Sequence, residues 1–139
     1  MQYLTAYFNR CYNGSMTKIA IIEDDATINQ MYRMKFESDG FEVQVATNGR
    51  DGIAVVQKFR PDMILLDLGM PEMPGDEALK EIRSYDWGKN IPVIILTNLG
   101  QEEAPKELRA LGIHSYIVKA ELTPKEVVAR VKEALGLAQ

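Results

Sequence analysis

Residues 63–67 read MILLD, four apolar residues without a polar break that end at a carboxylate. Two other stretches share this pattern, IAIIEDD at residues 19–25 and VIILT at residues 93–97. A continuous apolar run is typical of a strand covered on both faces, whereas a half-exposed strand alternates apolar and polar residues. These three stretches therefore predict a parallel sheet with helices on both sides.

Two weaker signals complete the set of strands, FEVQV at residues 41–45 and YIV at residues 116–118. The strand starts are spaced by roughly 20 to 30 residues, as right-handed strand–helix–strand units require. The sequence thus predicts an α/β domain in which strand and helix alternate five times.

Helices are expected after each strand: in the stretch that holds Ile28, Met31 and Met34 three residues apart, and at residues 48–59, 75–84, 102–111 and 123–136. Thr123 has the strongest start signal, because residues 123–126 read TPKE, a capping box with proline at the first helical position. Asn48 is a plausible N-cap for the second helix. Pro105 is expected to shorten the fourth helix, and Gly112 to close it.

The amino-acid composition excludes or disfavours several classes of protein. The chain has 139 residues, 46% hydrophobic and 26% charged, as in an ordinary globular domain, and a formal net charge of −4, which disfavours a dedicated nucleic-acid binder. The single cysteine, Cys11, excludes an internal disulfide framework and a multi-cysteine zinc site. The longest apolar runs have four or five residues, far short of a membrane span, and no secretory signal is evident. A cytoplasmic location is expected, with no nucleic-acid or membrane partner for this chain.

The first fifteen residues differ from the rest, with several aromatic residues and one charge, Arg10. We expect residues 1–15 to be an N-terminal extension or leader and residues 16–139 to form the domain. The alternative is a docked helix, because Leu4, Phe8, Cys11 and Tyr12 could share one helical face.

Polar residues follow directly where the predicted strands end, and in an open α/β sheet ligands bind at this carboxyl edge. These residues are Glu23, Asp24, Asp25, Asp67, Thr97 and Lys119. Carboxylates gathered in a small space call for a cation or raised pKa values, and an oxygen-only ligand set suits Mg²⁺. A lysine and a hydroxyl opposite the carboxylates suit a phosphoryl group. Each residue alone could be an ordinary loop residue; the four strand ends together favour a site.

With these motifs in place, residues 18–137 resemble the response-regulator receiver domain of two-component signalling. The resemblance rests on the motifs IIEDD ending at Asp25, LLDLGMP beginning at Leu65, LT ending at Thr97 and YIVK ending at Lys119. It implies a flavodoxin-like, doubly wound, five-stranded parallel sheet with strand order 2-1-3-4-5 and five helices.

The resemblance also implies roles. Asp67 would take a phosphoryl group from a sensor histidine kinase or a phosphotransfer protein, and Thr97 and Lys119 would contact that group. Mg²⁺ would be held by Asp24, Asp67 and the carbonyl of Gly69, with Glu23 acting through a water. Tyr116 would be a switch residue together with Thr97. A downstream protein partner would bind the fourth helix, fifth strand and fifth helix, and no substrate turnover is expected.

Several positions depart from the family pattern. Ala120 follows the strand-five lysine where the family usually has proline, which leaves the shape of that loop open. Asn98 is larger than the usual residue after Thr97 and narrows the space for that side chain. Gly69 offers no side chain to position a water, and Leu99 could shield a phosphoryl group, so slow self-dephosphorylation is expected.

Three alternatives remain. A flavodoxin-like flavin binder would need a phosphate loop where this chain has the acidic residues 23–25. An aspartyl phosphatase usually has a second aspartate two residues after the nucleophile, where this chain has Gly69. A receiver-like interaction domain that is not phosphorylated stays open because of Asn98 and Ala120.

Overall fold

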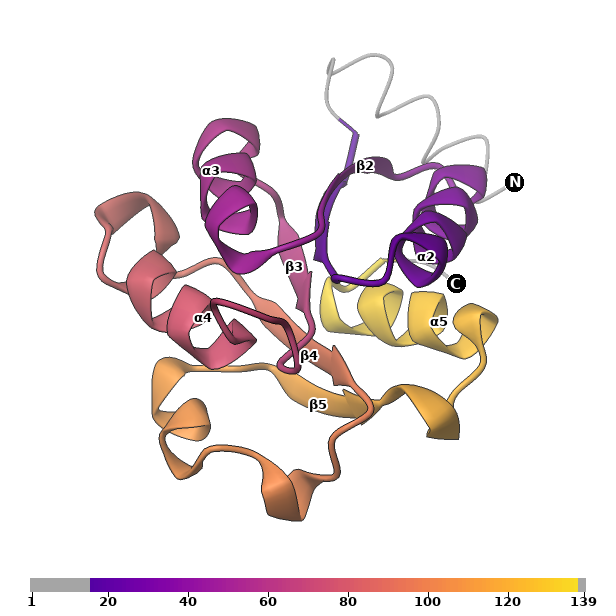
Figure 1. Ribbon diagram of the computed structural model, residues 1–139. Helices are drawn as coiled ribbons and strands as arrows, with labels where there is room; N and C mark the ends of the chain where they lie inside the picture. Colours follow the sequence, from indigo (N-terminus) through magenta and orange to yellow (C-terminus); the bar gives the residue numbers. More distant parts are fainter. Residues whose placement is uncertain (1–15, 138–139) are drawn as a thin grey trace.

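The structure, a computed structural model, describes residues 16–137. Its centre is a sheet of five parallel strands in the order β2-β1-β3-β4-β5 (Figure 1). The strands are β1 (Lys18–Ile22), β2 (Glu42–Ala46), β3 (Met63–Leu66), β4 (Val93–Thr97) and β5 (Ser115–Val118). The predicted fold class and strand order are confirmed.

Four α-helices cover the two faces of the sheet. They are α2 (Ala26–Ser38), α3 (Gly49–Phe59), α4 (Gly75–Arg83) and α5 (Pro124–Ala134). Figure 1 shows α2 and α5 on one face and α3 and α4 on the other. None of the helices within residues 16–137 is long and apolar enough to cross a membrane.

Neighbouring residues of each central strand belong to different layers of the core. In β1, Ile19 and Ile21 pack with α2 and α5, whereas Ala20 and Ile22 pack with α3 and α4. All four residues of β3 are at most 1% exposed. Burial on both faces therefore accounts for the unbroken apolar run that marks this strand in the sequence.

The helix starts follow the predicted caps. Thr123 accepts a hydrogen bond from the backbone of Glu126 at 3.2 Å, and the Glu126 carboxylate accepts one from the backbone of Thr123 at 3.0 Å. Asn48 accepts a hydrogen bond from the backbone of Asp51 at 2.8 Å, which caps α3. These side chains satisfy backbone N–H groups that have no partner within their helices.

The connection after β4 is less regular than the sequence predicts. It contains two short 3₁₀ segments, η2 (Gln101–Glu103) and η3 (Lys106–Leu111), which Ala104 and Pro105 separate. Proline has no N–H to continue a helical ladder, so a longer helix cannot run through this position. Gly112 ends η3 in the left-handed conformation, with φ 78°, at the predicted place. Two further 3₁₀ turns are η1 (Asp86–Gly88) and η4 (Lys119–Glu121).

The buried face of α2 is not the one that the three-residue spacing marks. Met31 and Met34 are 41% and 61% exposed, whereas Tyr32 and Phe36 are nearly fully buried. The aromatic side chains bury more apolar area than the methionines do, and their spacing of four residues keeps them on one face.

The prediction that residues 1–15 form an N-terminal extension or leader, and its alternative of a docked helix, concern residues outside the described part of the chain.

Gly75 provides a test of close packing at the start of α4. A methyl group at Gly75 would overlap the main-chain oxygen of Asp67, whereas one at Gly100 would meet open space. We expect Gly75→Ala to lower the free energy of unfolding by about 1–3 kcal/mol, because backbone cannot yield as a flexible side chain can. Gly100→Ala, the control, should be neutral or slightly stabilising, and urea unfolding measures both. Equal stabilities would contradict this account of α4.

Candidate functional site

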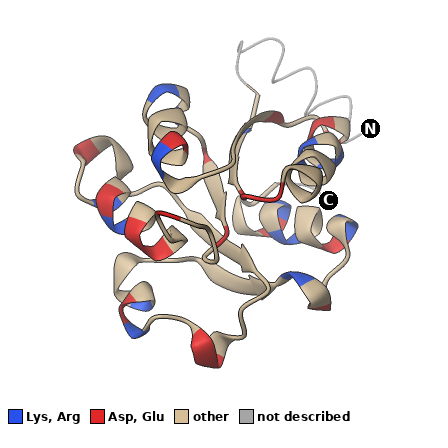
Figure 2. Ribbon diagram, in the orientation of Figure 1, with Lys and Arg blue, Asp and Glu red and all other residues tan. Residues whose placement is uncertain are grey.

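The carboxyl ends of β1 and β3 bring three acidic side chains together. Carboxylate oxygens of Glu23, Asp24 and Asp67 all lie within 4.8 Å of one another. The register explains the grouping, since Ile22 pairs with Leu66 and the next residues leave the sheet side by side. Figure 2 shows the acidic segment as the red loop that leads from β1 into α2.

Lys119 supplies a positive charge within this cluster. Its ammonium group lies 2.8 Å from a carboxylate oxygen of Glu23 and 3.5 Å from one of Asp67. The three side chains are 5% to 10% exposed, so water screens them little. β5 therefore delivers the predicted lysine to the carboxylates of β1 and β3.

Burial, hydrogen bonds and nearby charges shift the pKa values of Glu23, Asp67 and Lys119 in different directions. Burial, with a hydrogen bond to Asp67, raises the pKa of Glu23 to about 7. Burial also acts to raise the pKa of Asp67, but hydrogen bonds from Glu23 and Thr97 and the charge of Lys119 outweigh it and lower that pKa. Burial acts to lower the pKa of Lys119, but its bond to Glu23 and the charge of Asp67 raise it. Near neutral pH, Asp67 is thus ionised beside a charged lysine, whereas Glu23 is only partly ionised.

Thr97 and Tyr116 both contact the backbone of Leu99, through its N–H and its carbonyl respectively. The Thr97 hydroxyl accepts a hydrogen bond from the backbone N–H of Leu99 at 3.4 Å. The Tyr116 hydroxyl donates to the carbonyl of the same Leu99 at 2.8 Å. Burial raises the pKa of Tyr116, which keeps its hydroxyl a donor. A displacement of Thr97 would therefore act on the backbone that Tyr116 holds.

The donor set fits a hard divalent cation. Three carboxylates without histidine or cysteine form an oxygen-only site, which suits Mg²⁺ better than softer metals. Burial is the main cause of the raised pKa of Glu23; the negative charge of Asp67 adds to it, and Lys119 opposes it. Gly69 lies beside the cluster, and its N–H donates to Asp67 at 3.3 Å. The residues could hold such an ion.

Other predicted positions lie near the cluster without joining it. Asp25 accepts hydrogen bonds from the backbone of Thr27 and Ile28 at 2.9 and 3.0 Å, so it caps α2. Asn98 is exposed. The bond between Lys119 and Ala120 is trans, as are all peptide bonds of residues 16–137.

Two residues of α2 near the site were not predicted from the sequence. Tyr32, 3% exposed, lines a small cavity together with Glu23, Asp67 and Lys119. Asn29, 2% exposed, hydrogen-bonds the backbone at the ends of β1 and β2. Helical spacing alone did not indicate that these residues face inward, because the spacing of Ile28, Met31 and Met34 suggested another face.

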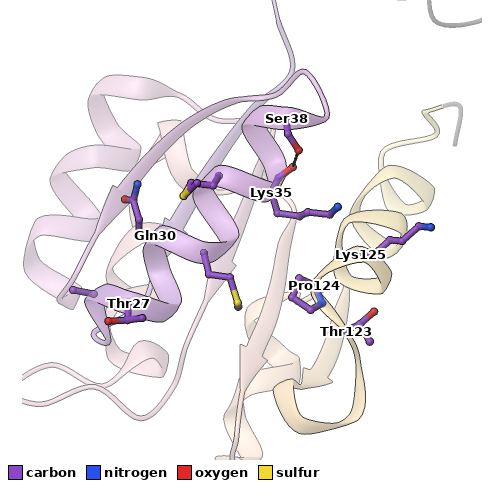
Figure 3. A pocket seen from close by; sticks show the side chains of 10 residues that line it. Thr27, Gln30, Lys35, Ser38, Thr123, Pro124 and Lys125 are labelled. Carbon is purple, nitrogen blue, oxygen red and sulfur yellow. Dashed lines mark hydrogen bonds between the residues drawn. The ribbon is translucent and has the colours of Figure 1, made fainter.

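A groove of about 1020 Å³ lies apart from the acidic cluster, between α2 and the start of α5 (Figure 3). Met31 and Met34 line it from α2, and Thr123, Pro124 and Lys125 from α5. Its lining combines apolar side chains with threonine, serine, glutamine and lysine side chains and includes no carboxylate. The chemistry of the described residues is therefore concentrated at the carboxyl edge of the sheet.

Comparisons with known proteins agree with this geometry. Residues 19–132 match the family model of the response regulator receiver domain. Chemotaxis protein CheY of Treponema pallidum is 33% identical over 126 residues, which cover 88% of this chain and 85% of that protein. Transcriptional regulatory protein ResD of Bacillus subtilis is 39% identical over 119 residues, which cover 86% of this chain. The chain spans only 48% of ResD and 22% of regulatory protein AtoC of Escherichia coli.

Solved structures are similar as well. Chemotaxis protein CheY4 of Vibrio cholerae superposes with a TM-score of 0.79 at 31% identity, over 86% of this chain and 98% of that one. The receiver domain of sensor histidine kinase PA1611 from Pseudomonas aeruginosa has a TM-score of 0.78 at 23% identity, over 88% and 99%. The latter likeness shows the fold; that protein has a magnesium ion coordinated in its active site cleft.

The raised pKa of Glu23 predicts that the metal-free protein loses stability as the pH rises from 4.5 to about 7. In this window the native state keeps a proton that the unfolded chain has released, so rising pH favours unfolding. Relative to Glu23→Gln, which cannot titrate, the free energy of unfolding should fall by on the order of 1–3 kcal/mol. Urea unfolding in EDTA across this pH range measures the difference.

Parallel pH profiles for the two proteins would show instead that Glu23 is already ionised in the native state. Asp67 does not interfere with this reading. Because its pKa is lowered, its contribution is lost only as the pH falls through its ordinary value of 3.8 and below, outside the window.

Proposed function

The chain belongs to the response regulator receiver domain family, and from this premise we propose that it is a phosphoacceptor that takes a phosphoryl group onto Asp67. The donor would be a phosphohistidine of a sensor histidine kinase or a phosphotransfer protein. The observation that supports this proposal most directly is the place of Asp67, a buried side chain that ends beside two further carboxylates and an ammonium group. Lys119 lies 3.5 Å from Asp67.

In the proposed transfer, a carboxylate oxygen of Asp67 forms a bond to phosphorus as the bond from phosphorus to the histidine nitrogen breaks. The electron pair of that bond stays on the leaving imidazole. Such transfer depends mainly on alignment and on neutralising negative charge. Lys119 and Thr97 would contact the phosphoryl oxygens, and both already lie against Asp67.

We assign the magnesium site to Asp24, Asp67 and the carbonyl of Gly69, with Glu23 acting through a water. The carboxylate cluster supports the assignment, because its donors are all oxygen and lie within 4.8 Å of one another. When bound, Mg²⁺ would neutralise charge on the phosphoryl oxygens. Glu23 must give up its proton to carry full charge in this role.

The proposed switch uses the contacts of Leu99. A phosphoryl group on Asp67 offers Thr97 new acceptor oxygens, and movement of Thr97 toward them would end the contact between its hydroxyl and Leu99. Tyr116, which holds the carbonyl of that residue, would then be released to turn inward. We propose that a downstream protein binds η3, β5 and α5; of these elements, β5 contains Tyr116.

The first test is chemical. Incubation with acetyl phosphate and Mg²⁺ should add one phosphoryl group to the protein, seen as a shift of its intact mass. Asp67→Asn, which keeps the size of the side chain but not the nucleophile, should gain none, and EDTA should prevent the reaction. A wild-type protein that binds Mg²⁺ yet gains no mass would favour a receiver-like interaction domain that is not phosphorylated.

The lifetime of the modified protein tests the roles of Gly69 and Leu99. A side chain at Gly69 would meet open space, so the wild type has no group there to orient an attacking water. We expect loss of the phosphoryl group over minutes or longer, and several-fold faster loss in Gly69→Asn and Leu99→Ala. Decay of the mass-shifted species after removal of acetyl phosphate measures this.

Gly100→Ala is the matched control for the lifetime experiment, since its methyl group also enters open space. It should decay like the wild type. Wild-type decay within seconds, or equal decay in all variants, would refute the assigned roles.

A further inference from the structure

Asn29 is a polar residue within the buried face of α2. It is 2% exposed and shares that face with Tyr32 and Phe36. Its amide nitrogen donates to two carbonyl oxygens, those of Glu23 and Ala46, each at 2.9 Å. One side chain thus ties α2 to the ends of β1 and β2.

These bonds hold the backbone directly before Asp24. The N–H of Glu23 donates to the carbonyl of Ala46 at 3.0 Å, and Asn29 donates to that carbonyl and to the carbonyl of Glu23. The peptide that joins Glu23 to Asp24 is therefore fixed at its oxygen. Rotation of this peptide would break the bond from Asn29 and turn the following carboxylate.

The other side of the turn is fixed by the same residue. The backbone N–H of Asn29 donates to the carbonyl of Asp25 at 2.8 Å. Asp24 lies between these two anchored residues and is itself exposed. Its direction relative to Asp67 consequently depends on main chain that the Asn29 amide holds before Asp24 and that a helical backbone bond, which any residue except proline would make, holds after it.

Packing alone does not account for an amide at this position. The side-chain oxygen of Asn29 is buried and has no hydrogen-bond partner among residues 16–137. Burying an unpaired polar atom is unfavourable, and an apolar side chain of similar size would avoid it. What an apolar side chain would lose is the pair of bonds to the carbonyls of Glu23 and Ala46.

We propose that Asn29 is a positioning residue for the cation site: its amide orients the turn at residues 23–25 so that the Asp24 carboxylate stays beside Asp67. This inference rests on the proposed function, in which these carboxylates hold Mg²⁺. Asn29 touches neither the ion nor the phosphoryl group, so it acts through the backbone of Glu23.

The test compares Mg²⁺ binding in Asn29→Leu, Asn29→Asp and the wild type by titration calorimetry. Both variants lose the donated bonds, and we expect the dissociation constant for Mg²⁺ to rise by about 10- to 100-fold, as for other residues that orient metal ligands. Asn29→Asp keeps the size of the side chain and adds negative charge, which by itself would tighten cation binding. Weaker binding in this variant therefore cannot be an effect of charge.

A second readout separates positioning from general loss of structure. With acetyl phosphate, the Mg²⁺ concentration for half-maximal phosphorylation should rise by the same factor, while the rate at saturating Mg²⁺ stays close to the wild-type rate. Ile82→Val, a core change at 0% exposure in α4, is the control for lowered stability. It should leave Mg²⁺ binding unchanged, and circular dichroism confirms that each protein is folded.

Wild-type affinity in Asn29→Leu, or an equal loss in Ile82→Val, would overturn the positioning role. If Asn29→Leu does not fold, Asn29→Ala, which also lacks the amide donors and adds no charge, decides the matter. Failure of the wild type to bind Mg²⁺ or to accept a phosphoryl group would instead overturn the proposed function. The two failures are therefore distinguishable.

Discussion

At the carboxyl edge of the sheet, the carboxylate oxygens of Glu23, Asp24 and Asp67 lie within 4.8 Å of one another, and repulsion among them is the constraint to which the surrounding structure responds. The ammonium group of Lys119 offsets part of this repulsion, because it lies 2.8 Å from Glu23 and 3.5 Å from Asp67. The pKa of Glu23 stays raised despite these contacts, chiefly because its side chain is buried. A group of like charges that is costly without a cation is well suited to bind one.

The strand order determines which side of Asp67 each partner occupies. β3 lies in the middle of the sheet, with β1 on one side and β4 on the other. Acidic residues therefore approach Asp67 from β1, whereas Thr97 approaches from β4 and Lys119 from β5 beyond it. The acidic residues of β1 and Thr97 thus lie on opposite sides of Asp67, whereas Lys119 reaches both Asp67, at 3.5 Å, and Glu23, at 2.8 Å.

The sequence was sufficient to predict the sheet because buried strands leave unbroken apolar runs, and polar residues at their ends must emerge at one edge. It also indicated the caps at Asn48 and Thr123, which are local signals. It did not indicate the partners of Asn29, because a polar residue in a helix is ordinarily exposed and its burial depends on packing against distant strands. The pairing of Lys119 with Glu23 is likewise a tertiary contact, across 96 positions of sequence.

The irregular connection after β4 has a consequence for the proposed switch. η2 has no buried residue, and η3 has only Leu108. Short 3₁₀ segments have poorer hydrogen-bond geometry than α-helices, and segments with few buried contacts open at low cost. The backbone of Leu99, which joins Thr97 to Tyr116, enters this connection directly. A small displacement of Thr97 would thus act on a part of the fold with little packing to resist it, while the core strands that position Asp67 remain in place.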